Sequence, residues 1–230
     1  MASYLELALE YLPVLNRIQN FKPKSIKDTI EFAFDPKNRI IVPSQIREEI
    51  YNFLTLISRR NIRNVLEIGS ANGGTLFMIA KTVRPDSRII SLDFGYTKFA
   101  GLMLLAKLIL FKSFLKTGKV TVINADSHKD ETRIKVIREM HGALDLLFID
   151  GDHSYEGVKK DFEMYQELVR KGGLIAFHDI MKRTPESDSG AKRLWGEIKG
   201  DYDYIEIIKD PEQDGYGIGI IYNKKRGQDI

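Results

Sequence analysis

Two stretches of the sequence decide the fold, LLFIDGDHSYE at residues 146–156 and GGLIAFHD at residues 172–179. Each is an apolar run of strand length whose last residues are acidic or histidine. Between them, apolar side chains recur at three- and four-residue steps, which predicts a helix that packs on a sheet and ends at Gly172-Gly173; the stripe consists of Tyr155, Val158, Phe162, Tyr165 and Val169. A strand, a helix and a second strand in this order are typical of a parallel βαβ unit.

The polar residues at the ends of these two strands form the first candidate site. Ligands of an open parallel sheet bind outside the carboxyl ends of its strands, so we expect four side chains to converge in one cleft: Asp150, His153, His178 and Asp179. Two carboxylates and two imidazoles favour a metal or general-base site, because placing them against apolar strands costs desolvation that structure alone seldom requires. The alternative is that Asp150 and Asp179 cap the helices that follow and that His153 supports a turn.

The same alternation continues on both sides of this unit. From residue 61 onward, strands are expected at residues 64–68, 88–93, 119–124, 144–150 and 173–178. Their near-continuous Val, Ile, Leu and Phe content predicts a parallel sheet with helices on both faces, which is a doubly wound α/β fold. A helix is expected at Gly190–Lys199. After it, Tyr204–Ile208 and Gly217–Tyr222 are joined by a short, turn-rich link, so these last two strands should be antiparallel.

Residues 1–60 have a different pattern. Helical periodicity over Tyr4–Ile18, with Pro13 inside it, and over Ser44–Ser58 flanks a stretch that contains several prolines. We interpret this part as a helical N-terminal cap or lid on a domain of residues 61–230. An added structural layer explains the pattern equally well. Caps of this kind can mediate self-association, so the sequence is compatible with a homo-oligomer as well as with a monomer.

Composition narrows the class of protein. With 230 residues, 43% of them hydrophobic and 29% charged, the chain can bury one sizeable core. A net charge of +3 without a long basic run disfavours nucleic acid as a partner. The apolar stretch Leu102–Leu115 is shorter than the roughly 20 residues of a membrane span, so we expect a helix packed on the sheet and no membrane partner. There is no cysteine, and Met1–Glu10 lacks the cationic start of a secretory signal, which favours a cytoplasmic protein.

A glycine-rich turn follows the first expected strand and reads EIGSANGGT at residues 67–75. Small residues in such a turn let backbone N–H groups approach a ligand. Asp93 ends the second strand, where a carboxylate can accept ribose hydroxyl hydrogens, and Asp126 with Ser127 follows the third, where an adenine amino group can be held. Both acids also have capping alternatives, but contacts at three successive strand ends indicate a nucleotide-like cofactor. A nicotinamide oxidoreductase would need Gly-x-Gly-x-x-Gly, and Ala71 stands at its second glycine.

On these residues, the part of the chain from about 61 to 222 resembles the class I S-adenosylmethionine-dependent methyltransferases. Within them it is similar to the group that contains macrocin-type and mycinamicin-type sugar O-methyltransferases and cephalosporin hydroxylase-like proteins. The resemblance rests on LEIGS (66–70), SLD (91–93), NADS (124–127), DGDHSYE (150–156) and the segment 172–179. It implies a Rossmann-like, seven-stranded sheet with an antiparallel last strand, and S-adenosylmethionine as cofactor. The implied cofactor-binding residues are Glu67, Gly69, Ser70, Gly73, Asp93, Asp126 and Ser127.

The mechanism expected from this resemblance needs little chemistry from the protein. S-adenosylmethionine carries its own leaving group, so the protein has to align an acceptor and remove a proton from it. Asp150 and Asp179 offer the oxygen ligands that magnesium prefers, and a bound divalent cation would lower the pKa of an acceptor hydroxyl. His153 is the expected base, as the metal-dependent relatives also imply; the alternative is a histidine bonded to the backbone.

His178 departs from those relatives, which carry an oxygen ligand beside the position of Asp179. An imidazole ligand at this position would favour manganese, iron or zinc; otherwise the site binds no metal and His178 is a polar contact.

The sequence therefore predicts an S-adenosylmethionine-dependent O-methyltransferase with metal assistance that acts on a small hydroxylated acceptor, such as a sugar or a glycosylated metabolite. The alternative is a non-catalytic cofactor-binding module or regulator of the same fold, which the intact Asp150, His153 and Asp179 disfavour. We expect Thr184–Ser189 to close over the substrate. His128 and His141 are expected to face solvent.

Overall fold

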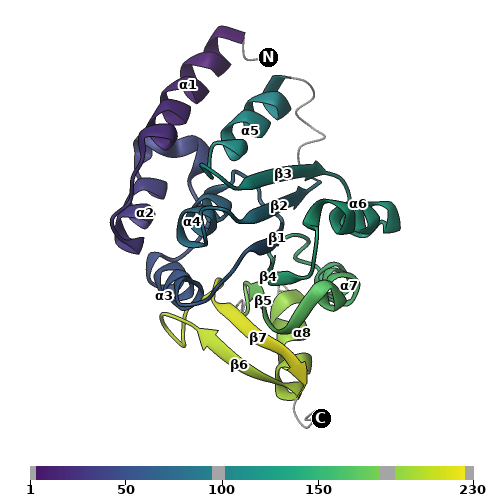
Figure 1. The fold of residues 1–230 in the computed structure, drawn as a ribbon. Helices are drawn as coiled ribbons and strands as arrows, with labels where there is room; N and C mark the ends of the chain where they lie inside the picture. Colours follow the sequence, from purple (N-terminus) through teal and green to yellow (C-terminus); the bar gives the residue numbers. More distant parts are fainter. Residues whose placement is uncertain (1–3, 95–101, 182–189, 226–230) are drawn as a thin grey trace.

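A seven-stranded sheet runs through the middle of the molecule (Figure 1). The structure is a computed structural model and describes residues 4–94, 102–181 and 190–225. The strand order is β3-β2-β1-β4-β5-β7-β6. The strands are β1 (Asn64–Ile68), β2 (Arg88–Asp93), β3 (Lys119–Asn124), β4 (Leu144–Ile149), β5 (Val169–His178), β6 (Tyr202–Ile207) and β7 (Ile218–Lys225).

Helices connect the strands and cover both faces of the sheet (Figure 1). The α-helices are α1 (Tyr4–Asn20), α2 (Ile26–Ala33), α3 (Arg47–Ser58), α4 (Gly74–Thr82), α5 (Leu102–Lys112), α6 (Asp130–Met140), α7 (Tyr155–Tyr165) and α8 (Gly190–Ile198). Short 3-10 helices are η1 (Pro36–Ile41), η3 (Gln166–Leu168) and η4 (Lys199–Asp201).

The strand pairing confirms the predicted fold class. Strands β1 to β5 pair in parallel, whereas β7 is antiparallel to both β5 and β6. The chain builds outward from β1 to β3 and then returns to place β4 on the other side of β1. Such a reversal opens a crevice at the carboxyl ends of β1 and β4, where ligands of open α/β sheets bind. The candidate residues therefore lie at the edge of the sheet where the topology favours a site.

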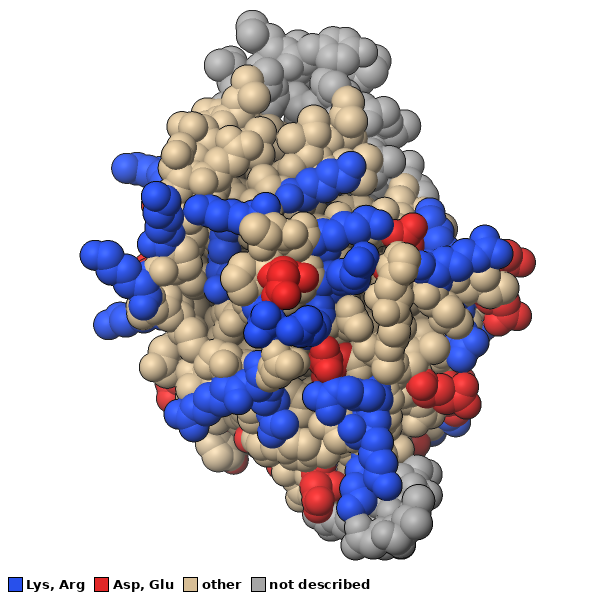
Figure 2. Space-filling model, in the orientation of Figure 1, with Lys and Arg blue, Asp and Glu red and all other residues tan. Residues whose placement is uncertain are grey.

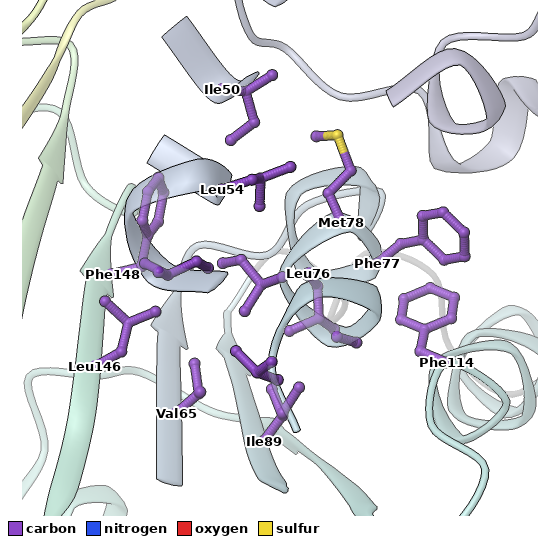
Figure 3. Close-up of a cluster of buried hydrophobic side chains, with 14 of the residues drawn as sticks. Ile50, Leu54, Val65, Leu76, Phe77, Met78, Ile89, Phe114, Leu146 and Phe148 are labelled. Atoms are coloured by element: carbon purple, nitrogen blue, oxygen red, sulfur yellow. The ribbon is translucent and has the colours of Figure 1, made fainter. Parts of the chain in front are cut away.

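Alternate residues of each strand enter two separate hydrophobic clusters, one on each face of the sheet. Val65 and Phe148 point to the face covered by α1 to α5, and Leu66 and Ile149 point to the face covered by α6 to α8. Figure 3 shows the first cluster, in which Leu54 of α3 and Leu76 of α4 pack over the strands. Because both faces are buried, the strands read as nearly continuous apolar runs.

The N-terminal residues form part of the same layer. Helices α2 and α3 contribute Ile30, Ile50 and Phe53 to the cluster that contains β1 and β4. A Cβ atom on Gly74, at the start of α4, would lie 2.2 Å from the Ile41 carbonyl oxygen, so the N-terminal segment also touches the beginning of α4. The structure thus joins this segment to the sheet by a continuous core, and the division at residue 60 stays a prediction.

The structure shifts some predicted boundaries. The helix expected to run to Val169 ends at Tyr165, because Val169 already pairs with Leu144 as the first residue of β5. A register shift separates this pair from the next one, and Gly172 adopts a φ of +74°, so the two glycines form an irregularity inside β5 rather than a helix end. The Thr184–Ser189 segment lies outside the described residues.

The face of the molecule drawn in Figure 2 carries Lys and Arg side chains spread over several elements and interrupted by acidic groups. Among the described residues, none of the helices combines the length and the apolar character needed to cross a membrane.

Candidate active site

The turn after β1 is tied to both neighbouring strands through backbone hydrogen bonds. Gly69 N–H donates to the Leu92 carbonyl at 2.9 Å, and Asp150 N–H donates to the Ile68 carbonyl at 2.9 Å. Gly69 has a φ of +88°, and a Cβ atom there would lie only 1.9 Å from the Asp150 carbonyl oxygen. Glycine is therefore required at this position, since both the backbone conformation and the close approach exclude a side chain. The turn after β1 and the end of β4 meet backbone to backbone.

Polar side chains under and beside this turn hold its shape. Asp93, at the end of β2, accepts a hydrogen bond from Ala71 N–H at 2.7 Å. Ser91 donates to Ser70 at 2.8 Å in the buried layer beneath. Burial raises the pKa of Glu67, at the end of β1, to about 8, against a lowering contribution from Ser70. Glu67 and Ser70 thus form a buried polar support for the turn.

A second turn follows β3 and lies across from the first. Asp126 accepts from His128 N–H at 2.9 Å, which closes an Asx turn, and α6 begins only after Lys129. The Ser127 carbonyl accepts a hydrogen bond from the Tyr165 hydroxyl of α7 at 2.8 Å. Asp126 is thus a turn residue and not the cap of α6.

One cavity of about 560 Å³ joins these turns to the end of β4. Its size lies in the range of cofactor and ligand pockets in proteins. It is lined by Ile68, Gly69, Ala71, Leu92, Asp93, Phe94, Ala125, Asp126, Ser127, His128, Asp150, Gly151, Asp152 and His153. Of the predicted cofactor residues, Glu67, Ser70 and Gly73 lie outside this lining, and a Cβ atom on Gly73 would lie 2.3 Å from the Phe111 ring.

The acidic and histidine residues converge at the β4 end of this cavity. His153 Nδ1 lies 2.9 Å from Asp179 Oδ2, and His153 Nε2 lies 3.8 Å from Asp150 Oδ1. His178 Nδ1 lies 3.1 Å from Asp150 Oδ1. Asp150, His153 and Asp179 each offer a ligand atom, and these atoms all lie within 4.8 Å of one another. The His178 side chain is only 3% exposed and stands behind Asp150, whereas that of His153 is 54% exposed.

None of these groups caps a helix among the described residues. The side chain of Ser154 accepts from Gly157 N–H at 3.0 Å and caps α7, with Asp152 accepting from Ser154 N–H at 2.8 Å. Asp179 instead accepts from Tyr216 N–H at 3.1 Å. The capping alternative for Asp150 and Asp179 therefore does not account for their positions.

The charges of the cluster are coupled. The hydrogen bond to Asp179 raises the pKa of His153, and burial opposes this effect. Burial opposes a charge on His178, but the nearby Asp150 carboxylate, with Asp179 and Glu49, outweighs it and raises the pKa of that imidazole. The pKa of Asp179 is lowered, because the hydrogen bond from His153 and the neighbouring imidazoles outweigh burial. The contact between His153 and Asp179 thus favours an ionised carboxylate on Asp179 and a bound proton on the imidazole.

A buried carboxylate on α3, in the N-terminal part of the chain, supports the cluster of Asp150, His153 and Asp179 through a neighbouring loop. Glu49 of α3 is fully buried and accepts from Lys209 N–H at 3.0 Å, from the Gln213 side chain at 2.7 Å and from Gly217 N–H at 2.9 Å. These donors belong to the loop between β6 and β7, which carries Tyr216. Glu49 therefore fixes the loop whose backbone holds Asp179.

Sequence reasoning missed three side chains that line or surround this site. Glu49 was not singled out, and neither was Asp161 of α7, which is fully buried. His128 was expected to face solvent, but this prediction is wrong: its side chain is 21% exposed, lines the cavity and lies 3.2 Å from Asp161. The available signal was the place of Asp161 next to the apolar stripe of α7, one residue before Phe162.

Comparison with known proteins shows the family to which the chain belongs. Residues 66–180, half of the chain, match the family model described as a methyltransferase domain. The chain belongs to this methyltransferase family. The matched part contains the residues that line the cavity and the cluster at Asp150.

Relatives and solved structures agree with this assignment. The methyltransferase is 26% identical over 196 residues to a protein of Dictyostelium discoideum named probable caffeoyl-CoA O-methyltransferase 1, a match that covers 82% of this chain and 75% of that protein. An uncharacterized protein of Acanthamoeba polyphaga mimivirus is 44% identical over 50 residues, so the match spans 22% of this chain and only 23% of that protein. An O-methyltransferase from Bacillus cereus, solved with SAH, superposes with a TM-score of 0.61 at 17% identity, over 90% of this chain and 95% of that one.

These findings confirm an S-adenosylmethionine-dependent methyltransferase and its Rossmann-like fold. They support the resemblance to the class I methyltransferases. They do not single out the sugar O-methyltransferase subgroup or an acceptor.

We expect Asp93→Ala to weaken binding of S-adenosylhomocysteine roughly tenfold or more, because hydrogen bonds to a charged acceptor contribute about 1.5–3 kcal/mol. Titration calorimetry on the purified methyltransferase measures this. Asp203→Ala on β6 is the control, since that aspartate is exposed and is not among the residues that line the cavity. An affinity of Asp93→Ala equal to wild type would remove Asp93 from the cofactor site.

Proposed function

We propose that this methyltransferase transfers the methyl group of S-adenosylmethionine to a hydroxyl oxygen of a small acceptor. The observation that supports it is the continuity of one cavity from Asp93 and Asp126 to Asp150 and His153. The residues fit the cofactor: two carboxylates at neighbouring strand ends suit an adenosine, and the cavity is large enough to hold it. In this proposal Gly69, Asp93, Asp126 and Ser127 bind the cofactor directly, while Glu67, Ser70 and Gly73 shape the turn.

S-adenosylmethionine supplies a methyl group on a positively charged sulfur, which makes that carbon an electrophile. An acceptor placed between Asp150 and His153 forms its oxygen–carbon bond as the carbon–sulfur bond breaks, and loses its proton. His153 is suited to take this proton. Its Nδ1 is engaged by Asp179 at 2.9 Å, which fixes the ring and leaves Nε2 facing Asp150 at 3.8 Å.

A divalent cation would be held by Asp150 and Asp179, whose oxygens suit magnesium. The geometry allows this, since a carboxylate oxygen of Asp150 and one of Asp179 lie within 4.8 Å of each other. The nitrogen of His178 that faces this site already lies 3.1 Å from Asp150, so in this proposal His178 orients Asp150 and is not a ligand. The bound cation would lower the pKa of an acceptor hydroxyl.

We expect a chelator to abolish methyl transfer and added Mg²⁺ to restore it, with Asp150→Asn losing Mg²⁺ binding in calorimetry. A single preparation of the methyltransferase, assayed with EDTA, with EDTA plus excess Mg²⁺ and with EDTA plus excess Zn²⁺, measures this. Restoration by Zn²⁺ alone would replace magnesium by zinc in the proposal. Full activity in EDTA would show that methyl transfer needs no metal ion. Removal of the acceptor proton would then be assigned to the His153–Asp179 pair alone.

A panel of candidate acceptors of different chemical classes tests which group is methylated. Purified protein is incubated with S-adenosylmethionine and, in turn, monosaccharide glycosides, a catechol, caffeoyl-CoA and amines of similar size, and the S-adenosylhomocysteine formed is measured. Mass spectrometry of the products locates the methyl group. Methylation of sugar hydroxyls would support the macrocin-like subgroup, and methylation of caffeoyl-CoA or the catechol would support the acceptor named for the Dictyostelium relative. Methylation of amines alone would overturn O-methyl transfer.

A further inference from the structure

A second cavity lies at the far end of α4 from the turn after β1. It has a volume of about 340 Å³ and shares no lining residue with the cavity that contains Asp93 and Asp150. Helix α4 begins at Gly74, beside that turn, and its nine residues carry the chain roughly 12 Å away. Three lysines line the second cavity, which we call the lysine cavity: Lys22, Lys81 and Lys116. It is therefore a separate place on the molecule.

The three lysines come from segments that are far apart in the sequence. Lys22 lies between α1 and α2, Lys81 in the last turn of α4, and Lys116 after the end of α5. Among the described residues, no acidic side chain lines the cavity. A cleft with charges of one sign concentrates ligands of the opposite sign. The folded chain thus gathers positive charge at a hollow that suits an anion.

Lys81 is the partly buried member of this group. Its ammonium donates to the Phe114 carbonyl at 2.8 Å and lies 5.4 Å from the centre of the Phe77 ring. An ammonium has three N–H groups, and the other two have no acceptor among the residues that the structure describes. Burial and the nearby Lys116 lower the pKa of Lys81 to about 8, with no carboxylate acting against them. A bound anion would offset this cost.

The rest of the cavity wall is apolar. Phe21 and Phe114 line it, and their ring centres lie 5.8 Å and 5.3 Å from that of Phe77. Figure 3 shows Phe77 and Phe114 side by side at the edge of the first hydrophobic cluster. Apolar walls with a few polar groups are typical of small-molecule sites, and the volume lies within their range. The wall suits the carbon skeleton of a ligand whose charged group meets the lysines.

A smaller hollow of about 190 Å³ adjoins the lysine cavity, because Pro23 and Lys81 line both. It adds a fourth cation, Lys24, and the hydroxyl-bearing residues Ser25, Thr29, Ser58 and Thr82. No acidic residue of the described chain lines it either. The surroundings of Lys81 thus offer further donors for the oxygens of an anion.

We propose that the lysine cavity is a second ligand site of the methyltransferase and that it binds a small organic phosphate monoester. Such a group carries roughly 1.5–2 negative charges at pH 7, so it matches several ammonium groups better than a carboxylate does. The phosphate oxygens accept hydrogen bonds from Lys81 and the two other lysines, and the carbon skeleton packs on Phe21 and Phe114. The inference does not depend on the acceptor or the metal of the methyl-transfer reaction.

Titration calorimetry on the protein saturated with S-adenosylhomocysteine tests the ligand class with four probes: phenyl phosphate, inorganic phosphate, benzoate and anisole. Phenyl phosphate is expected to bind roughly tenfold or more tightly than each of the others, because it alone combines a ring with a doubly charged group. Added NaCl should weaken its binding, since salt screens the exposed lysines.

Variants of two lysines locate the site. Lys81→Met keeps the apolar stem and removes the ammonium, so it should bind phenyl phosphate roughly tenfold or more weakly. Lys116→Gln should lose about two- to fivefold, because Lys116 is exposed. Lys112→Gln is the matched control, since Lys112 is exposed on α5 and does not line the cavity. The affinity of all three for S-adenosylhomocysteine should stay within roughly twofold of wild type.

Several results would contradict this second site. Phenyl phosphate that binds no more tightly than anisole, or that binds Lys81→Met and Lys116→Gln like Lys112→Gln, would remove it. Tighter binding of benzoate would make the ligand a carboxylate, and equal binding of inorganic phosphate would show that the apolar wall is not used; either result overturns the proposal. Thermal melting monitors folding, and if Lys81→Met does not fold, Lys116→Gln decides. None of these results bears on O-methyl transfer.

Discussion

Replacing His153 by alanine is expected to lower turnover about 10²–10⁴-fold, while the affinity for S-adenosylhomocysteine stays within roughly twofold of wild type. The physical reason is the arrangement of its two nitrogens. Nδ1 is held by Asp179 at 2.9 Å, so Nε2 is the nitrogen that faces Asp150 and an acceptor placed there. Removing the ring removes the proton acceptor but leaves the adenosine contacts in place. Single-turnover kinetics on the acceptor identified by the panel, with calorimetry for the cofactor, measures both quantities.

The pH dependence gives a second readout of the same role. A base must be neutral, so activity is present above the pKa of His153 and is lost as the pH falls through it. Because the hydrogen bond to Asp179 raises that pKa, the acid limb of wild type should lie above the ordinary histidine value. His153→Ala should lack this limb. His141→Asn serves as the control histidine, and a His153→Ala variant with nearly normal turnover would reduce His153 to a residue of the turn before α7.

Replacing Glu49 by alanine is expected to lower the free energy of unfolding by about 2–4 kcal/mol, because it leaves the donors on Lys209, Gln213 and Gly217 without their acceptor. For a chain of this length such a loss corresponds to a melting temperature lower by roughly 5–15 °C. Differential scanning calorimetry and urea unfolding measure it. Turnover should fall as well, since the loop that Glu49 holds carries Tyr216, whose N–H binds Asp179.

The neighbouring acid provides a matched control for this prediction. Glu48 precedes Glu49 on the same turn of α3 but is exposed, so Glu48→Ala should leave unfolding within about 0.5 kcal/mol of wild type. If Glu49→Ala melts like Glu48→Ala, the buried carboxylate does not support the loop. Retention of the Asp179 geometry would then need another explanation.

The order of β1 to β5 could be predicted because these strands are largely apolar and each connection between them is long enough for a helix, and the short link between β6 and β7 predicted an antiparallel pair. The exceptions arise where tertiary pairing overrides local pattern. Val169 continues the apolar stripe of α7 by its spacing, but its backbone pairs with Leu144 and so belongs to β5. A periodicity argument cannot detect this, because the same residue satisfies the helical stripe and the strand.

The candidate site could be predicted in part for a similar reason. Gly69, Asp93, Asp126 and Asp150 all stand at the ends of strands, and the topology of a parallel sheet brings such positions together. His128 and Asp161 could not be paired from the sequence, because 33 positions and a whole strand separate them and their contact depends on how α7 sits against the turn after β3. Glu49 lies farther still from the loop that it holds, and only the packed α3 brings them into contact.

The close approach of Gly69 to Asp150 limits which parts of this enzyme can change when its acceptor specificity changes. A side-chain contact can be retuned by substitution, but here two main chains touch, with room for no more than a hydrogen on Gly69. In the proposed function the methyl donor binds beside Gly69 and the proton leaves beside Asp150, so these two places belong to one body that is joined by main-chain contacts. New acceptors have to be accommodated by the parts that surround this body, such as the N-terminal helices and the loop between β6 and β7. Libraries that vary those parts and keep residues 67–69 and 149–151 unchanged would explore specificity without displacing the reacting groups from each other.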